Sequence, residues 1–174
     1  MPENNHIIQY PKEYSTCTGC HSCQLVCVLT HDGVAGLEQG RIHCEMGKVN
    51  EMLHTVYACQ QCADHPCYDR CPKKDTAMCI DENGIVYVNE DGCIGCGLCV
   101  KACPFTPARV HVVQSKDKTK RKAKKCDLCR NRPEGPACIE FCPVQCLGQS
   151  KDPLPEITVV DLNAAVDTTA TPGH

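Results

Sequence analysis

Hydrophobic positions along the chain fall in short runs, separated by cysteine, glycine, proline and polar residues. The segments Arg41–Met46 and Leu53–Ala58 have the composition of two strands, and the turn-forming segment Gly47–Asn50 lies between them. Residues Ile85–Val88 are mostly β-branched and follow the turn signal Asn83-Gly84, so Met78–Val88 is predicted to form a hairpin.

Further short elements are predicted in the second half of the chain and near its start. Val110–Val113 is a strand candidate, and Gln24–Leu29 and Val100–Cys103 favour short helical turns. Ser115–Lys125 is predicted to be a lysine-rich connector, and residues 151–174, rich in Pro, Thr and Asp, an extended tail. No run of 18 apolar residues occurs, so no transmembrane helix is expected.

The composition is rich in cysteine and poor in large aromatic residues. The 174 residues include five Tyr, two Phe and no Trp, so a conventional core is small and another source of stability is needed. Cysteine occurs 19 times, which implies either a disulfide scaffold or a metal scaffold. The net charge of −3 gives no strong bias toward nucleic acid or anionic membranes.

Three features favour metal ligation over disulfides. The first residues, MPENNHIIQYPKEYS, lack the apolar core of a secretory signal, the cysteine count is odd, and most cysteines lie in tight groups. We therefore expect a reducing, cytoplasmic location, and export together with a signal-bearing partner stays open.

Sixteen cysteines form four groups of four, and in every group three residues separate the last two cysteines. In chain order the groups are Cys17, Cys20, Cys23 and Cys27; Cys59, Cys62, Cys67 and Cys71; Cys93, Cys96, Cys99 and Cys103; and Cys126, Cys129, Cys138 and Cys142. Groups two and four are the same unit with short insertions between their second and third cysteines. Proline follows the last cysteine of groups two to four, whereas Val28 follows group one.

The spacing C-x2-C-x2-C-x3-C of groups one and three is that of bacterial ferredoxins. There the first three cysteines hold one [4Fe–4S] cluster and the fourth crosses to another. Crossing requires the groups to work in pairs, and the residues alone allow either adjacent or nested pairing. Structural zinc is the main alternative, but four cysteines within 11 residues suit a tetrahedral zinc site poorly.

The chain resembles the four-cluster ferredoxin-like electron-transfer subunits of dimethyl-sulfoxide-reductase type. Three segments carry the resemblance: CQQCADHPCYDRCP (59–72), DENGIVYVNEDGCIGCGLCVKACPF (81–105) and KCDLCRNRPEGPACIEFCP (125–143). Members of this family serve molybdenum- or tungsten-pterin oxidoreductases such as formate dehydrogenase, formate hydrogenlyase, and the tungsten aldehyde-oxidoreductase and benzoyl-CoA-reductase systems, and also carbon-monoxide dehydrogenase.

The resemblance implies nested pairing and four [4Fe–4S] clusters, with every cysteine of the four groups an iron ligand. The implied sets are Cys17, Cys20, Cys23 and Cys142; Cys126, Cys129, Cys138 and Cys27; Cys59, Cys62, Cys67 and Cys103; and Cys93, Cys96, Cys99 and Cys71. The expected fold is α+β: two bacterial-ferredoxin-like dicluster modules with short helices, hairpins and an extended C-terminal tail. The inner module covers 59–115, the outer module 12–58 plus 116–150, and the tail 151–174.

Cys44, Cys79 and Cys146 lie outside the groups and are interpreted as small buried residues. Cys142 and Cys146 repeat the terminal spacing, and Pro143 favours Cys142 as the ligand. The run KDKTKRKAKK (116–125) carries seven basic residues and one acid. It is interpreted as a solvated loop or, alternatively, a docking patch for an acidic partner. Because it contains no stacking aromatic, nucleic acid is its least favoured partner.

No nucleotide loop, catalytic triad or dinucleotide fingerprint occurs, so no catalytic residue is predicted. The expected function is electron transfer within a multi-subunit oxidoreductase of anaerobic metabolism. The clusters would connect a catalytic subunit, with a molybdenum- or tungsten-pterin favoured, to a further redox subunit or ferredoxin. The alternatives are a free-standing polyferredoxin shuttle and an electron-transfer partner of a hydrogenase or carbon-monoxide dehydrogenase.

Overall fold

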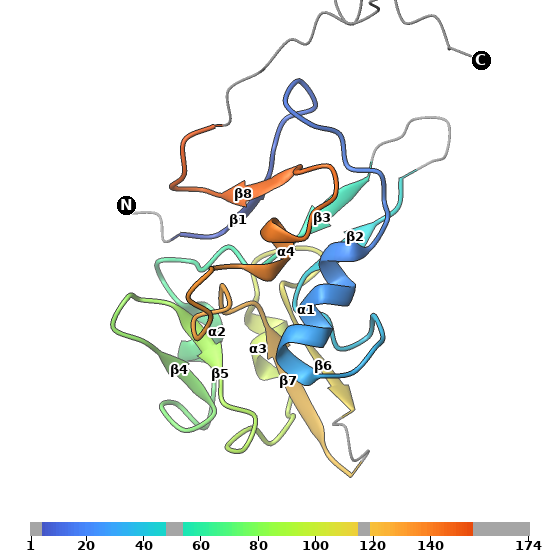
Figure 1. The fold of residues 1–174 in the computed structure, drawn as a ribbon. Coiled ribbons are helices and arrows are strands. Elements are labelled where there is room, and N and C mark those ends of the chain that lie inside the picture. The colour runs from blue at the N-terminus through green and yellow to red at the C-terminus, as the bar shows by residue number, and fades with distance from the viewer. Residues whose placement is uncertain (1–4, 48–53, 115–118, 155–174) are drawn as a thin grey trace, which may run out of the picture.

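The computed structural model describes residues 5–47, 54–114 and 119–154. Within these ranges short helices alternate with short strands, which confirms the mixed α and β content expected from the sequence (Figure 1). The elements are β1 (Ile7–Gln9), α1 (Ser22–Asp32), β2 (His43–Glu45), β3 (Thr55–Tyr57), α2 (Pro66–Asp69), β4 (Met78–Ile80), β5 (Val86–Val88), α3 (Leu98–Ala102), β6 (Val110–Gln114), β7 (Arg121–Lys125), α4 (Ala137–Glu140) and β8 (Leu147–Gln149).

The strands of the described residues form four separate antiparallel pairs. The predicted strand pair around residue 50 is confirmed as β2–β3, in which Cys44 lies opposite Val56. The predicted hairpin is confirmed as β4–β5, in which Met78 lies opposite Val88. The turn Gly47–Asn50 falls largely outside the described residues.

Strands β1 and β8 pair although they lie near opposite ends of the described chain (Figure 1). Ile7 lies opposite Gln149, and Gln9 lies opposite Leu147. Neither strand was predicted, since each has only three residues and its pairing partner is far away in the sequence. This pair holds the segment before the first cysteine group against the segment after the last.

The prediction that Ser115–Lys125 forms a connector is wrong for its second half. Residues Arg121–Lys125 form β7, which pairs with β6 so that Val110 lies opposite Lys125. The solvated-loop interpretation fails there too, because Lys124 is 1% and Lys125 2% exposed. The two side chains leave opposite faces of the strand, as the period of two requires, and each face is covered by a different part of the protein.

The four helices share one feature that links the fold to the cysteine groups. Each begins one residue before the third cysteine of its group, so that Cys23, Cys67, Cys99 and Cys138 occupy equivalent positions. Helix α1 extends the predicted Gln24–Leu29 in both directions, and α3 overlaps the predicted Val100–Cys103. The one-turn helices α2 and α4 were not predicted.

Two groups of buried residues form the interior of the described chain. The first contains Ile7, Ile42, Leu128 and Leu147 together with cysteines of groups one, two and four. The second contains Met78, Val86, Val110 and Ala123, with cysteines of groups two and three against it. Cysteine therefore supplies much of the interior that large apolar side chains supply elsewhere.

All nineteen cysteines are free thiols. None of the helices in the described ranges combines the length and apolar character needed to cross a bilayer. Residues 151–154 are exposed and follow the last strand, whereas most of the predicted tail, 155–174, lies outside the described residues.

Candidate iron–sulfur sites

Three of the four helices in the described residues follow a residue with a left-handed backbone conformation. These residues are His21 at φ 59° before α1, His65 at φ 44° before α2 and Gly97 at φ 76° before α3. Each group therefore follows the same course, in which a loop carries the first two cysteines and a helix carries the third. The insertions in groups two and four lie before the helix and leave this arrangement intact.

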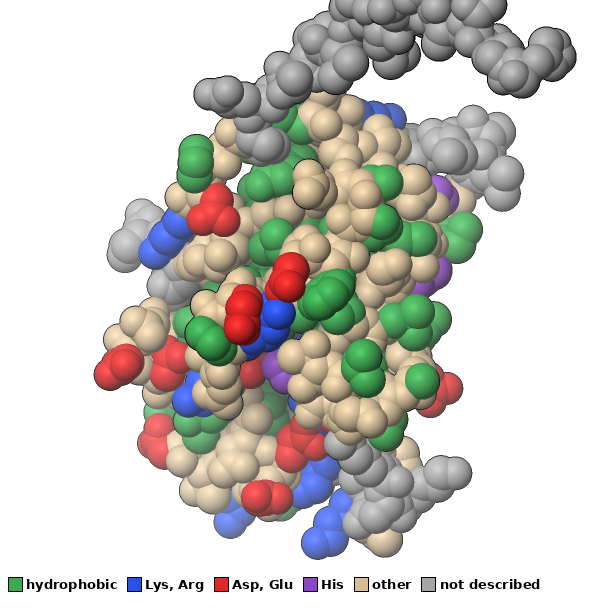
Figure 2. All heavy atoms as spheres, viewed as in Figure 1, with side chains coloured by type: hydrophobic (Ala, Val, Ile, Leu, Met, Phe, Trp, Pro, Cys, Tyr) green, Lys and Arg blue, Asp and Glu red, His purple; other side chains and the backbone are tan. Residues whose placement is uncertain are grey.

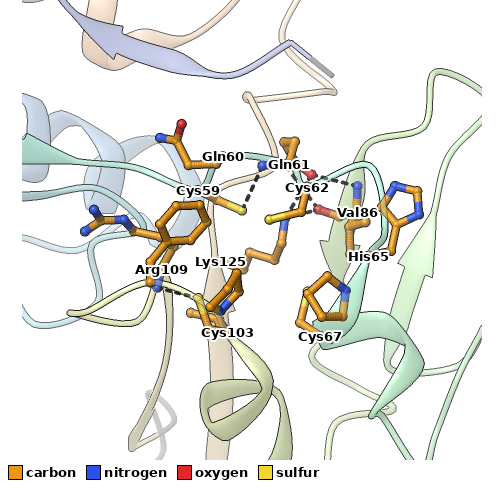
Figure 3. A pocket seen from close by; sticks show the side chains of 14 residues that line it. Cys59, Gln60, Gln61, Cys62, His65, Cys67, Val86, Cys103, Arg109 and Lys125 are labelled. Carbon is orange, nitrogen blue, oxygen red and sulfur yellow. Dashed lines mark hydrogen bonds between the residues drawn. The ribbon is translucent and has the colours of Figure 1, made fainter. Parts of the chain in front are cut away.

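One pocket brings together cysteines from groups two and three. Its lining includes Cys59, Cys62 and Cys67 from the second group and Cys103, the last cysteine of the third (Figure 3). A second pocket mirrors the first, with Cys93, Cys96 and Cys99 from group three and Cys71 from group two. Each pocket thus takes three cysteines from one group and the fourth from the other.

Groups one and four also lie beside each other, and most of their buried cysteines belong to the same cluster of buried residues. Burial raises the pKa of the Cys23 thiol to about 12, and three neighbouring thiols add to the shift: Cys17, Cys142 and Cys20. Burial also raises the pKa of Cys138 strongly, with contributions from the neighbouring cysteines Cys126, Cys27, Cys129 and Cys23. Cys142 of group four thus interacts with Cys23 of group one, and Cys27 of group one interacts with Cys138 of group four.

Backbone N–H groups donate to seven of these sulfurs at 3.2–3.5 Å. The acceptors include the last cysteine of every group: Cys27, Cys71, Cys103 and Cys142. N–H donors stabilise an anionic sulfur, as a metal-bound thiolate is. They therefore offset part of the cost of burying thiolates.

The donor set fits a cluster ligated entirely by sulfur. Each group of four consists of soft thiol ligands with at least one backbone N–H donor, and nine of the sixteen cysteines are buried. Across the described ranges, no three His, Cys, Asp or Glu side chains converge tightly enough to hold a single metal ion. Because burial raises the pKa of Cys27 and Cys67 to about 11, loading iron must displace protons from these thiols.

The three cysteines outside the groups are buried, as predicted: Cys44 and Cys79 are 8% and Cys146 is 2% exposed. Cys146 lies close to a predicted ligand, because its Sγ is 3.6 Å from that of Cys142 and its N–H donates to the same sulfur. Burial raises the pKa of Cys44 to about 12, with Cys17 the next contributor, so Cys44 lies beside the same site.

A buried ion-pair network was missed by the sequence analysis. The ammonium of Lys124 lies 2.7 Å from Asp32 and 2.6 Å from Glu90, and the guanidinium of Arg41 lies 2.8 Å and 3.0 Å from the same two carboxylates. The network ties the end of α1 to β7 and to the loop after β5. The signal that could have revealed it is the strand alternation within the run RKAKK.

Two of the sixteen cysteines, Cys20 and Cys96, are exposed. Hydrophobic side chains are also exposed, among them Leu29 of α1 at 61% and Ile94, next to Cys93, at 62%. Figure 2 shows hydrophobic side chains interspersed with acidic and basic ones on the visible face. Cysteines of groups one and three thus reach the surface.

Comparisons with known proteins show that this chain is similar to iron–sulfur proteins. A family model described as a 4Fe-4S dicluster domain matches residues 50–151. The chain is 36% identical to the electron transport protein HydN of Escherichia coli (strain K12) over 149 residues, covering 76% of this chain and 82% of HydN. It is 37% identical over 130 residues to the polyferredoxin-like subunit of the aliphatic sulfonate oxidoreductase of Pyrococcus furiosus, covering 72% of this chain and 66% of that subunit.

A third relative is much longer than the matched region. The chain is 37% identical over 134 residues to the putative oxidoreductase AegA of Escherichia coli (strain K12), covering 75% of this chain but only 20% of AegA. The similarity is therefore to one part of that protein.

Proposed function

This chain belongs to the 4Fe–4S dicluster family of iron–sulfur electron transport proteins, and from that premise we propose that it carries single electrons through four [4Fe–4S] clusters within a multi-subunit oxidoreductase. The observation that carries the proposal is the lining of the two inner pockets. Each presents four cysteines, three from one group and one from its partner. The sixteen grouped cysteines provide for four such sites.

The proposed ligand sets follow the nested pairing. They are Cys17, Cys20, Cys23 and Cys142; Cys126, Cys129, Cys138 and Cys27; Cys59, Cys62, Cys67 and Cys103; and Cys93, Cys96, Cys99 and Cys71. The pocket linings support the two inner sets. The electrostatic interactions of Cys142 with Cys23 and of Cys27 with Cys138 support the two outer sets. On this basis the chain divides into an inner module at 59–115 and an outer module at 12–58 plus 116–150.

A bound [4Fe–4S] cluster supplies one-electron chemistry, and the protein decides where and at what potential it operates. The sulfurs of the four groups hold each site in place, and seven of the eight cysteines in the two outer sets are buried from water. Backbone donors such as the N–H groups of Gly19 and Gln61 favour the charged form of the sulfur they contact. The exposed Cys20 and Cys96 are candidate points at which electrons enter or leave.

A catalytic oxidoreductase subunit is the proposed partner, and one that carries a molybdenum- or tungsten-pterin is favoured. The resemblance to subunits of dimethyl-sulfoxide-reductase type supports this choice. The name of the Pyrococcus relative, a polyferredoxin-like subunit of an oxidoreductase, supports a subunit role. We place the complex in a reducing, cytoplasmic environment, which suits a protein whose nineteen cysteines form no disulfide.

A free-standing carrier is the second candidate. Two relatives of similar length from Escherichia coli (strain K12), HydN and YsaA, are named as electron transport proteins and not as subunits of an enzyme. Co-purification with a catalytic chain favours the subunit, whereas a monomer in native extracts favours the carrier.

Metal analysis of the natively purified protein, kept free of oxygen, tests the proposal. We expect about sixteen irons and matching acid-labile sulfide per chain, and tungsten or molybdenum in any co-purifying complex. About four zincs without sulfide would overturn the proposal. A matched pair of variants tests ligation: Cys99→Ala should lose iron, whereas Cys79→Ala, which removes an equally buried cysteine outside the groups, should keep it all.

A further inference from the structure

Lys125 is a buried cation at the edge of one candidate cluster site. Its side chain is 2% exposed, and its Nζ donates to the carbonyl oxygens of Val86 at 2.6 Å and Cys126 at 3.2 Å and to Oε1 of Gln61 at 3.0 Å. An ammonium has three N–H bonds. The three acceptors therefore satisfy it fully, and all three are uncharged.

The neighbouring lysine shows what is unusual about this arrangement. Lys124 is equally buried, at 1% exposure, but it forms ion pairs with Asp32 and Glu90. In the part of the chain that the structure describes, no carboxylate lies within ion-pair distance of Lys125. A buried charge is costly unless an opposite charge compensates it. Lys125 therefore needs a counter-charge that is not one of these side chains.

The pocket that Lys125 lines can provide that charge. Lys125 shares the lining with the four cysteines Cys59, Cys62, Cys67 and Cys103 (Figure 3). Burial raises the pKa of the Cys67 thiol to about 11, and the charge of Lys125 is the largest opposing influence. The ammonium is thus within electrostatic reach of this sulfur. A [4Fe–4S] cluster with four thiolate ligands carries a net negative charge, which grows by one when an electron is added.

Gln61 fixes the lysine in this position. It is 1% exposed, and its side-chain oxygen accepts from Lys125 and from the N–H of Val86 while its amide donates to the carbonyl of Cys126. Its own N–H donates to Cys59 Sγ at 3.4 Å. Gln61 and Lys125 thus connect the inner pocket to Cys126, the first cysteine of group four.

We propose that Lys125 is the internal counter-charge of the cluster in the pocket of Cys59, Cys62, Cys67 and Cys103, and that it raises that cluster's reduction potential. The proposal rests on the proposed function. A fixed positive charge stabilises the reduced cluster more than the oxidised one, since the reduced cluster is the more negative. The effect is strong because the surroundings are buried and of low dielectric constant.

The second inner pocket has a less buried lysine beside it, because Lys122 is partly buried and its Nζ donates to the carbonyl oxygen of Cys93 at 2.8 Å. The lining of this pocket contains apolar side chains, such as Met78 and Val88, and one lysine, Lys73, which is exposed. Lys125 is more deeply buried than either of these lysines and lines only the first pocket, so its removal is expected to change the potential of the first cluster and leave that of the second.

Redox titration of the full-length, cluster-loaded protein, followed by electron paramagnetic resonance, tests the proposal. Iron and sulfide are measured first, so that a protein without clusters contradicts the proposed function and not this inference alone. In Lys125→Met we expect one cluster to shift to a clearly lower midpoint potential while the cluster of the second inner pocket keeps its value. The matched control is Lys101→Gln, which removes the charge of an exposed residue of α3, between Cys99 and Cys103, where water screens it.

A second variant tests the same charge without removing the lysine. Gln61→Glu places a carboxylate where an oxygen already lies 3.0 Å from Lys125 Nζ, so the same cluster should again shift to lower potential. If Lys125→Met fails to take up its full iron content, Gln61→Glu still tests whether the charge of Lys125 sets the potential of this cluster. Fully loaded variants whose potentials equal those of the wild type, or shift no more than those of Lys101→Gln, would overturn the proposal.

Discussion

Removing the charge of Lys124 tests whether the buried ion pairs hold the two parts of the interior together. In Lys124→Met the aliphatic part of the side chain is retained, while Asp32 and Glu90 lose their shortest ionic contacts, 2.7 Å and 2.6 Å. The side chain of Asp32 is only 3% exposed, so water cannot replace the lost partner.

The expected loss of stability in Lys124→Met follows from the burial of the ion-pair network. Breaking a buried ion pair by removing one partner costs about 3–5 kcal/mol, and we expect about 3 because Arg41 still contacts both carboxylates. For a protein of this size, each kcal/mol lowers the unfolding temperature by roughly 2–4 °C. The variant should therefore unfold roughly 6–12 °C below the wild type.

The assay is anaerobic heating of the cluster-loaded protein at a fixed scan rate, with unfolding followed as loss of visible iron–sulfur absorbance. A fixed rate matters because cluster loss makes unfolding irreversible. Lys74→Met is the matched control: Lys74 pairs with Asp69 at 2.9 Å, but the two side chains are 42% and 64% exposed. An exposed pair contributes about 1 kcal/mol or less. If both variants carry full iron and unfold at the same temperature, the reasoning from burial is refuted.

Three further predictions concern glycine, histidine and cysteine. Gly95→Ala should lose iron or unfold, because a β-carbon would lie 2.3 Å from a backbone oxygen of β7. In Gly97→Ala a β-carbon meets nothing within 4 Å, so this variant should keep its iron and lose about 1–2 kcal/mol of stability, and iron content distinguishes the two variants. Burial lowers the pKa of His111 from 6.5 to about 4, so the unfolded chain binds more protons and stability should fall as the pH is lowered from 6.5 to 4. Unfolding curves of His111→Phe should depend less on pH than those of the wild type, and an equal pH dependence would contradict this prediction. Cys142→Ala should lose iron and Cys146→Ala should keep it, and the reverse result would exchange their roles.

The hairpin β4–β5 and the strands β2 and β3 could be predicted because their signals are local. Turn residues and β-branched runs lie next to each other in the sequence, and the partner strand follows within a few residues. Strands β1 and β8 could not be predicted in this way, because their pairing joins Ile7 to Gln149. A three-residue strand has too little pattern of its own to reveal a partner so far away.

In the lysine-rich run 116–125 the local sequence pattern led to a wrong prediction. Seven basic residues in ten favour a solvated segment, yet Lys124 and Lys125 are among the most buried side chains of the protein. Their burial depends on Asp32, Glu90 and Gln61, which come from distant parts of the chain. Nothing in residues 116–125 encodes these partners.

The sequence by itself determined the kind of chemistry. Ligand spacing is a local property, and a tight loop followed by a helix can present three thiols wherever it lies in the fold. The residues alone left open which fourth cysteine joins which three. Only the tertiary structure decided that Cys103 shares a pocket with Cys59 and that the ammonium of Lys125 lines that same pocket, because these contacts depend on how distant segments pack.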